Sequence, residues 1–117
     1  MIYTLYRIIA GADPTVIDFR SHMARCQSRR FAEIQDHALW AGVSTFLNPL
    51  HAAARARRFS TLGTHLPRLE IPDDDPRVVE RQTLDPRSAH FTVWACEDLL
   101  LTFAREITAI SARSVVE

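Results

Sequence analysis

The stretch Trp40-Ala41-Gly42-Val43-Ser44-Thr45-Phe46-Leu47-Asn48-Pro49 is the most clearly organised part of this 117-residue chain. Residues 43–47 are rich in β-branched and aromatic side chains, which is typical of a strand. Asn48 can cap a helix, and Pro49 suits the first helical position, where no amide donor is needed. The stretch therefore predicts a strand that leads directly into a helix, whose free amides would suit an anionic ligand.

The composition is that of one ordinary globular domain. The chain is 47% hydrophobic and 24% charged, and its length suits one core and not two. No apolar run approaches the length of a membrane span, and Met1–Arg7 lacks the pattern of a secretory signal. Cys26 and Cys96 are too few for a disulfide framework. We therefore expect a cytoplasmic protein without membrane association.

The charges are unevenly distributed along the chain. All 14 basic residues are Arg, and nine of them lie in residues 1–69 against four acids, a balance of +5. Residues 70–117 hold five Arg against ten acids, a balance of −5. This pattern fits either mixed opposite charges on the surface or a polarised surface. Arg55, Arg57 and Arg58 predict a basic helix face, but a nucleic-acid site needs more positive charge and interleaved aromatic residues, so we expect no nucleic-acid binding.

Periodicity outside the opening stretch predicts both helices and strands. Residues 105–111 fit a helix or a closing strand equally well, and both alternatives stay open. The first half of the chain is expected to form a strand at 2–9, a helix that begins at Asp13-Pro14, a helix from Phe31 to before Gly42, the strand at 43–47 and a helix from Pro49 to about Phe59. The first of these helices would place Val16, Phe19, Met23 and Cys26 on one face, and the last would turn Leu50, Ala53 and Ala54 inward. The second half is expected to form strands at 66–71, 78–83 and 89–95, and a helix that begins at Glu97-Asp98.

These elements predict a single α+β domain over residues 1–117. We expect a mixed or antiparallel sheet of about five strands with three or four helices. In this sheet Trp94 would be largely buried, and its indole N–H would then need a hydrogen-bond acceptor.

Three polar side chains interrupt strands that are otherwise apolar. Arg7 lies between Tyr6 and Ile8, Glu80 lies within residues 78–83, and His90 opens an aromatic strand. A charge in a central strand is costly unless it is paired or faces a cleft. One interpretation is structural: Arg7 pairs with Glu80 on a neighbouring strand, or each side chain points to solvent from a sheet edge. The other is a cleft in which Arg7 holds an anionic ligand and Glu80 or His90 polarises it.

Other candidate sites lack residues that their chemistry requires. Gly42 to Phe46 begins like a nucleophile elbow, but Phe46 stands where the tight turn needs a second glycine, so Ser44 is expected to be an ordinary strand hydroxyl. His22 and Cys26 have the spacing of two metal ligands on a helix, and residues 73–75 are three aspartates. Further ligands are not placed by either pattern, so we expect no metal site.

The order of these features resembles small NAD-using ADP-ribosyltransferase-type domains, including the RES-type toxins. The resemblance rests on Tyr6-Arg7 in an early strand, Gly42–Phe46 leading into a helix, and Glu80 in a later strand. It implies that Arg7 grips NAD, that Ser44 and Phe46 line the nicotinamide pocket, and that Glu80 orients the ribose. Trp40-Ala41-Gly42 stands where RES-type domains have a Gly-Gly-Arg-Trp-Asn-like run.

A second resemblance is to small bacterial proteins that combine Trp-x-Gly-x-Ser-x-Phe with a His-x-Thr-x-Trp strand. In this chain the first motif is residues 40–46 and the second is residues 90–94. This resemblance implies no particular activity.

Three functional hypotheses follow, and they leave open whether the protein is an enzyme. The first is binding of a nucleotide-like or anionic small ligand, as in an NAD-using ADP-ribosyltransferase or glycohydrolase, with Arg7, Ser44 and Phe46 binding the cofactor and Glu80 and His90 catalytic. The second is a non-catalytic accessory or immunity-type module that binds a protein partner through the Arg-rich half, and a homodimer is compatible with it. The third is a small biosynthetic enzyme with His90 and Glu80 as acid and base.

Overall fold

The computed structural model describes residues 2–21, 23–24, 37–83 and 89–110. These residues form one six-stranded sheet in the order β4-β5-β2-β1-β3-β6, and all its registered pairs are antiparallel. The predicted α+β class is confirmed, with the antiparallel alternative realised. The elements are β1 (Ile2–Tyr6), η1 (Val16–Phe19), α2 (His37–Ala41), β2 (Val43–Phe46), α3 (Pro49–Arg58), η2 (Ser60–Leu62), β3 (His65–Pro72), β4 (Val79–Gln82), β5 (His90–Trp94), α4 (Glu97–Thr102) and β6 (Ala104–Ala109), where η marks a 3-10 helix.

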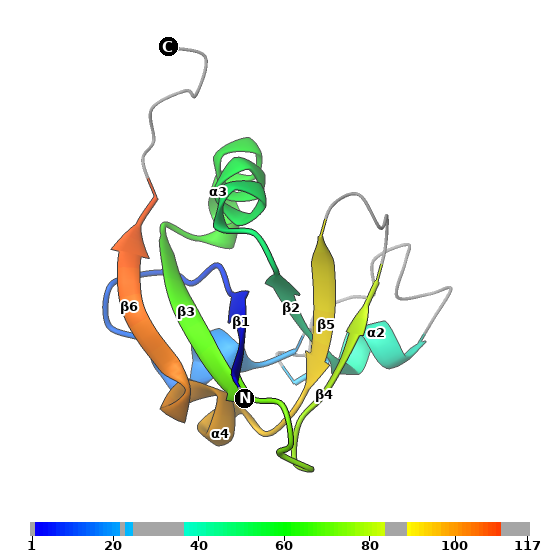
Figure 1. The fold of residues 1–117 in the computed structure, drawn as a ribbon. Helices are drawn as coiled ribbons and strands as arrows, with labels where there is room; N and C mark the ends of the chain where they lie inside the picture. The colour runs from blue at the N-terminus through cyan, green and yellow to red at the C-terminus, as the bar shows by residue number, and fades with distance from the viewer. Residues whose placement is uncertain (1, 22, 25–36, 84–88, 111–117) are drawn as a thin grey trace.

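The sheet consists of two groups of three strands joined at one place. β1 pairs with β3 along its whole length, from Ile2 to Tyr6, and β2 pairs with β5 along its whole length. β1 and β2, in contrast, share the single registered pair Tyr6–Phe46. Figure 1 shows the β6-β3-β1 group and the β4-β5-β2 group on either side of this junction, with α3 at one end of the strands and α4 at the other.

The main core lies on the sheet face that η1 and α4 cover. Side chains on this face alternate with those of the opposite face along each strand, as the period of two requires. Burying each large aliphatic side chain stabilises the fold by about 1.5–3 kcal/mol. The buried members of this core are Leu5, Phe19, Val43, Leu69, Ile71, Val78, Val93 and Leu100.

A second core lies beneath α3 on the opposite face of the sheet. Ala52 and Ala56 are four residues apart, so they share one side of the helix, and both pack against a cluster that includes Phe46. Leu50, predicted to point inward with Ala53 and Ala54, is instead 74% exposed, and that prediction is wrong. The small side chains of Ala52 and Ala56 allow the helix to approach the sheet closely, which turns Leu50 outward.

The strand-to-helix prediction at residues 43–58 is confirmed in detail. β2 ends at Phe46, and the Asn48 Oδ1 accepts a hydrogen bond from the Leu50 amide at 2.8 Å, while Pro49 is the first helical residue. The side chain therefore caps the helix as the sequence indicates.

The first predicted helix is not formed where the sequence placed it. Thr15, and not Asp13, caps η1, and the Asp18 carboxylate accepts a hydrogen bond from the Thr15 amide at 2.8 Å. The Asp18 side chain thereby stabilises a short 3-10 turn. Cys26 and the start of the second predicted helix lie outside the described residues. Near the C-terminus, residues 104–109 form strand β6, which resolves the helix-or-strand alternative.

No helix within the described ranges is long and apolar enough to cross a bilayer.

Candidate functional site

Arg7 lies at the junction of the two strand groups and bonds to main-chain oxygens. Its Nε donates to the carbonyl oxygen of Asp18 at 3.1 Å, and its Nη1 donates to that of Ser44 at 2.8 Å. Arg7 thus ties the end of β1 to both η1 and β2. Because these donors point at the backbone, Arg7 acts here as a structural bridge.

Glu80 does not lie beside Arg7. Two strands, β5 and β2, separate β4 from β1, so the predicted placement on neighbouring strands is wrong. The charge of the Glu80 carboxylate acts instead on the Tyr3 hydroxyl. Burial, followed by the charges of Glu80, Asp73 and Asp75, raises the pKa of Tyr3 to about 12. Strand order is set by contacts between distant segments, which local sequence patterns do not report.

His90 is a packed core residue with a satisfied ring nitrogen. It is 6% exposed, and its ring meets the Phe46 ring edge-on at 5.2 Å between centroids. Its Nδ1 lies 2.8 Å from the Thr83 Oγ1, which lies 2.8 Å from the Thr92 Oγ1. Burial, with the nearby charges of Arg55 and Arg7, lowers the pKa of His90 to about 4. The imidazole is therefore neutral near pH 7 and shielded from solvent.

Four of the five predicted site residues nevertheless lie together. Ser44 is exposed on β2 and directly opposite Thr92, its carbonyl accepts the bond from Arg7, and Phe46 contacts His90. Phe46 is 8% exposed, so this place is filled by packed side chains. Arg7, Ser44, Phe46 and His90 thus form a structural cluster, and Glu80 stands apart from it.

Trp94 is half-buried, whereas the sequence predicted a largely buried side chain. The expected partner of its indole is present, because Nε1 donates to the carbonyl oxygen of Ala38 at 2.9 Å. The other side of the ring meets the guanidinium of Arg81 at 5.2 Å. A side chain at Gly42 would collide with Thr92 and Trp94, so glycine is needed where α2 turns into β2.

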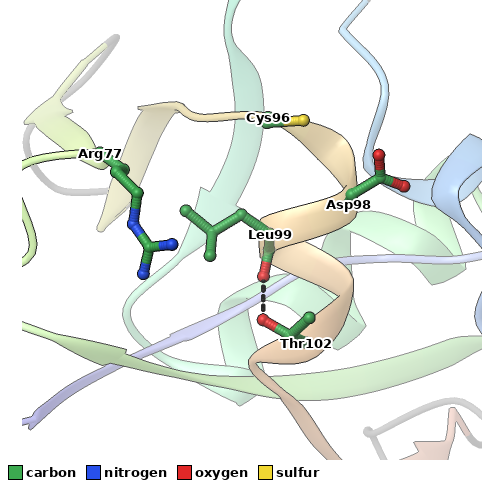
Figure 2. Close-up of a pocket in the computed structure, with 5 residues that line it drawn as sticks. All are labelled: Arg77, Cys96, Asp98, Leu99 and Thr102. Atoms are coloured by element: carbon green, nitrogen blue, oxygen red, sulfur yellow. Dashed lines mark hydrogen bonds between the residues drawn. The ribbon is translucent and has the colours of Figure 1, made fainter.

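The depression in Figure 2 lies beside α4, and none of the predicted site residues lines it. It has a volume of about 400 Å³ and is lined by Arg77, Cys96, Asp98, Leu99 and Thr102. The Thr102 hydroxyl donates to the Leu99 carbonyl at 2.6 Å, and Arg77 is held by Asp75 at 2.7 Å. The lining contains no histidine, which is the usual base beside a cysteine nucleophile. In the part of the chain that the structure describes, no three His, Cys, Asp or Glu residues gather to hold a metal.

The outer side of α3 carries the most distinctive exposed surface. We define the α3 surface as Leu50, Ala54, Arg55, Arg58 and Phe59, all of which are exposed. The guanidinium carbons of Arg55 and Arg58 lie 4.8 and 5.3 Å from the centre of the Phe59 ring. The sequence indicated the arginines of this surface but missed its apolar part, because Leu50 was expected to face the core.

Comparisons with protein-family models, with curated proteins and with solved structures found no match for this chain. The resemblance to ADP-ribosyltransferase-type domains therefore stays a prediction. Any functional proposal therefore depends on the geometry of the described residues.

Replacing Arg7 by Leu should lower the free energy of unfolding, because the carbonyls of Asp18 and Ser44 lose a charged donor. Hydrogen bonds to charged groups each contribute roughly 1.5–3 kcal/mol, and a loss of that order is expected in urea unfolding. Arg7→Lys keeps the charge but cannot form the same fork, so it should fall between Arg7→Leu and the wild type. Equal unfolding midpoints for Arg7→Leu and the wild type would contradict the bridging role.

His90 should make the stability of the wild type depend on pH. Its pKa is about 4 in the folded protein, against 6.5 as the ordinary value, so the unfolded chain takes up the proton first as the pH falls. The free energy of unfolding should therefore decrease by about 3 kcal/mol between pH 7 and pH 4 on account of this group alone. His90→Gln should remove this contribution from urea unfolding curves, whereas His51→Gln, at an exposed position, should retain it. Parallel pH profiles for the wild type and His90→Gln would be inconsistent with this explanation.

Proposed function

We propose that this protein is a non-catalytic protein-binding module that docks its α3 surface onto an acidic and partly apolar partner. The observation that carries the proposal is Phe59, an exposed aromatic ring with two guanidinium groups held over it. Phe59, at the C-terminal end of α3, is 42% exposed, and Leu50, in the first turn of α3, is 74% exposed. Aromatic and Arg side chains are enriched at protein interfaces, and they include the residues that most often dominate binding energy.

The charge of this region favours an acidic partner. Residues 37–69 contain no Asp or Glu, so the charges of Arg55 and Arg58 are not balanced by an acid in their own segment. Their contact with Phe59 holds the planar guanidinium groups in place, which reduces the ordering needed when they bind. Carboxylates are the groups that such planar forks recognise best. Leu50 and Phe59 would add apolar contact area to these charged bonds.

The competing small-ligand and cleft-enzyme hypotheses have less support from the geometry. They require Arg7 to hold the ligand and His90 to exchange protons with it. Arg7 donates to the carbonyls of Asp18 and Ser44, and His90 is 6% exposed. Glu80 is separated from this cluster by the strand order.

The binding proposal can be tested with a labelled amphipathic helical peptide that carries leucines on one side and glutamates on the other. Wild-type protein should bind it, and Arg55→Glu/Arg58→Glu and Leu50→Ser should each weaken binding at least tenfold in fluorescence anisotropy. Exposed substitutions usually change stability by less than about 0.5 kcal/mol, so the variants should stay folded. Ile17→Ser and Arg105→Glu are matched controls, at exposed positions on η1 and β6. Equal binding by Arg55→Glu/Arg58→Glu and the wild type would show that the α3 surface is not used.

The small-ligand hypothesis makes a different prediction about thermal stability. A ligand that binds only the folded protein stabilises it by about 2.7 kcal/mol at a hundredfold excess over Kd, which shifts Tm by several degrees. We expect millimolar NAD, ADP-ribose and phosphate to leave Tm unchanged. A shift that disappears in Ser44→Ala would instead support the small-ligand site and displace the binding-module proposal.

A further inference from the structure

We propose that Ser60 is a phosphorylation site, and that its phosphate pairs with Arg55 and Arg58 and thereby weakens partner binding at the α3 surface. Ser60 is exposed and directly follows Phe59, and its side chain makes no hydrogen bond with any residue that the structure describes. The effect on partner binding rests on the proposed function, whereas the modification of Ser60 and the pairing of its phosphate do not.

The residues before Ser60 have the charge pattern of a substrate for a kinase with an acidic cleft. The run Arg57-Arg58-Phe59-Ser60 places arginines three and two positions before the hydroxyl, and no other Ser or Thr of the chain has arginines at both positions. Kinases select substrates by charge patterns, and carboxylates recognise planar guanidinium groups through paired hydrogen bonds. This pattern distinguishes Ser60 from other exposed hydroxyl residues, among them Ser44, Thr61 and Thr64.

The segment that carries Ser60 can enter such a cleft without disturbing the core. Phe59 and Ser60 lie in the connection between α3 and β3, and both are exposed (Figure 1). An extended fit requires the last turn of α3 to unwind, which breaks the 3.0 Å hydrogen bond from the Phe59 amide to the Arg55 carbonyl oxygen. Helix ends open at low cost. Beyond Ser60 the chain is fixed again at Thr64, whose amide donates to the Ile9 carbonyl oxygen at 2.9 Å.

The kinase supplies ATP and Mg²⁺ for the transfer. The Ser60 Oγ attacks the γ-phosphorus of ATP and forms an O–P bond, while the bond from the γ-phosphorus to the β–γ bridging oxygen breaks and ADP leaves. The hydroxyl proton passes to the catalytic aspartate of the kinase. The product carries roughly 1.5–2 negative charges at pH 7 and three strong acceptor oxygens.

The phosphate would lie beside two guanidinium groups that the fold already holds in place. The guanidinium carbons of Arg55 and Arg58 lie 4.8 and 5.3 Å from the centre of the Phe59 ring. The Cα atom of Ser60 is about 3.8 Å from that of Phe59, because the two residues are consecutive. Residues 37–69 contain no Asp or Glu, so no acid of this segment competes for the two arginines.

Phosphorylation would cancel most of the positive charge of the α3 surface. Arg55 and Arg58 are its two charged members, with a combined charge of +2, and the phosphate brings roughly 1.5–2 negative charges. The phosphate oxygens would also occupy the planar forks that otherwise bind carboxylates of the partner. An acidic partner should therefore bind the modified protein more weakly.

Phosphorylation of the full chain by cyclic-AMP-dependent protein kinase tests the site. Mass spectrometry should locate the phosphate on Ser60, and Ser60→Ala should take up none. Arg57→Gln removes one recognition arginine but keeps Arg55, Arg58 and Phe59, so it should be phosphorylated at least about tenfold more slowly and still bind the acidic peptide. A folded wild type that takes up no phosphate, or takes it up only at other residues, overturns the site.

Phosphorus NMR of the modified protein tests the pairing without reference to any partner. The Ser60 phosphate should lose its last proton at a lower pH in the folded protein than in concentrated urea, because nearby guanidinium groups favour the dianion. Arg55→Gln keeps both recognition arginines, so it should be phosphorylated normally but show a smaller difference. Equal titration in the folded and unfolded states overturns the pairing.

Fluorescence anisotropy with the acidic peptide then measures the effect on the α3 surface. Phosphorylated wild type should bind at least about tenfold more weakly than unmodified wild type. Equal affinities overturn the regulation. An unmodified wild type that does not bind the peptide refutes the proposed function and the regulation together, while the mass spectrum and the phosphorus titration still decide the modification site and its pairing.

Discussion

The guanidinium group of Arg7 connects the two groups of strands, which have little main-chain pairing with each other. β1 and β2 share one registered pair, Tyr6–Phe46, whereas their other neighbours are paired along whole strands. At this junction, Arg7 donates hydrogen bonds to the carbonyl oxygens of Ser44 on β2 and Asp18 on η1. One side chain thus supplies hydrogen bonds between strand groups that share a single registered main-chain pair.

The sequence predicted correctly those elements whose structure depends on residues close to one another in the chain. The strand at Val43–Phe46, the cap at Asn48 and the first helical position of Pro49 all depend on residues within a few positions of each other. The strand predicted at residues 89–95, where β5 forms, was recognised for the same reason. Leu50 was misplaced because the rotation of α3 is set by its fit against the sheet, and the small side chains of Ala52 and Ala56 make that fit possible. Strand order is likewise a property of distant contacts, so the separation of Arg7 from Glu80 could not be derived from periodicity.

The polar residues selected from the sequence are unusual, but for structural reasons. Arg7 and His90 were singled out because charged or titratable groups in apolar strands need partners. The partners are main-chain carbonyls for Arg7, and for His90 a pair of threonine hydroxyls reached through Thr83. The apolar part of the α3 surface was not predicted from the sequence, since it depends on which side of α3 faces water. Burial and exposure of individual residues, more than their chemical type, separate structural from functional candidates here.

The single-pair junction also has a mechanical consequence. Two strand groups that share little main-chain bonding can rotate relative to each other at a lower cost than strands within either group, because few hydrogen bonds oppose the motion. The line between β1 and β2 is therefore where main-chain hydrogen bonds oppose such a rotation least, and Arg7 bonds across this line. η1 and α4 cover both groups from one face, and α3 contacts both from the other, so any such rotation would change the angle between the two layers that enclose the sheet.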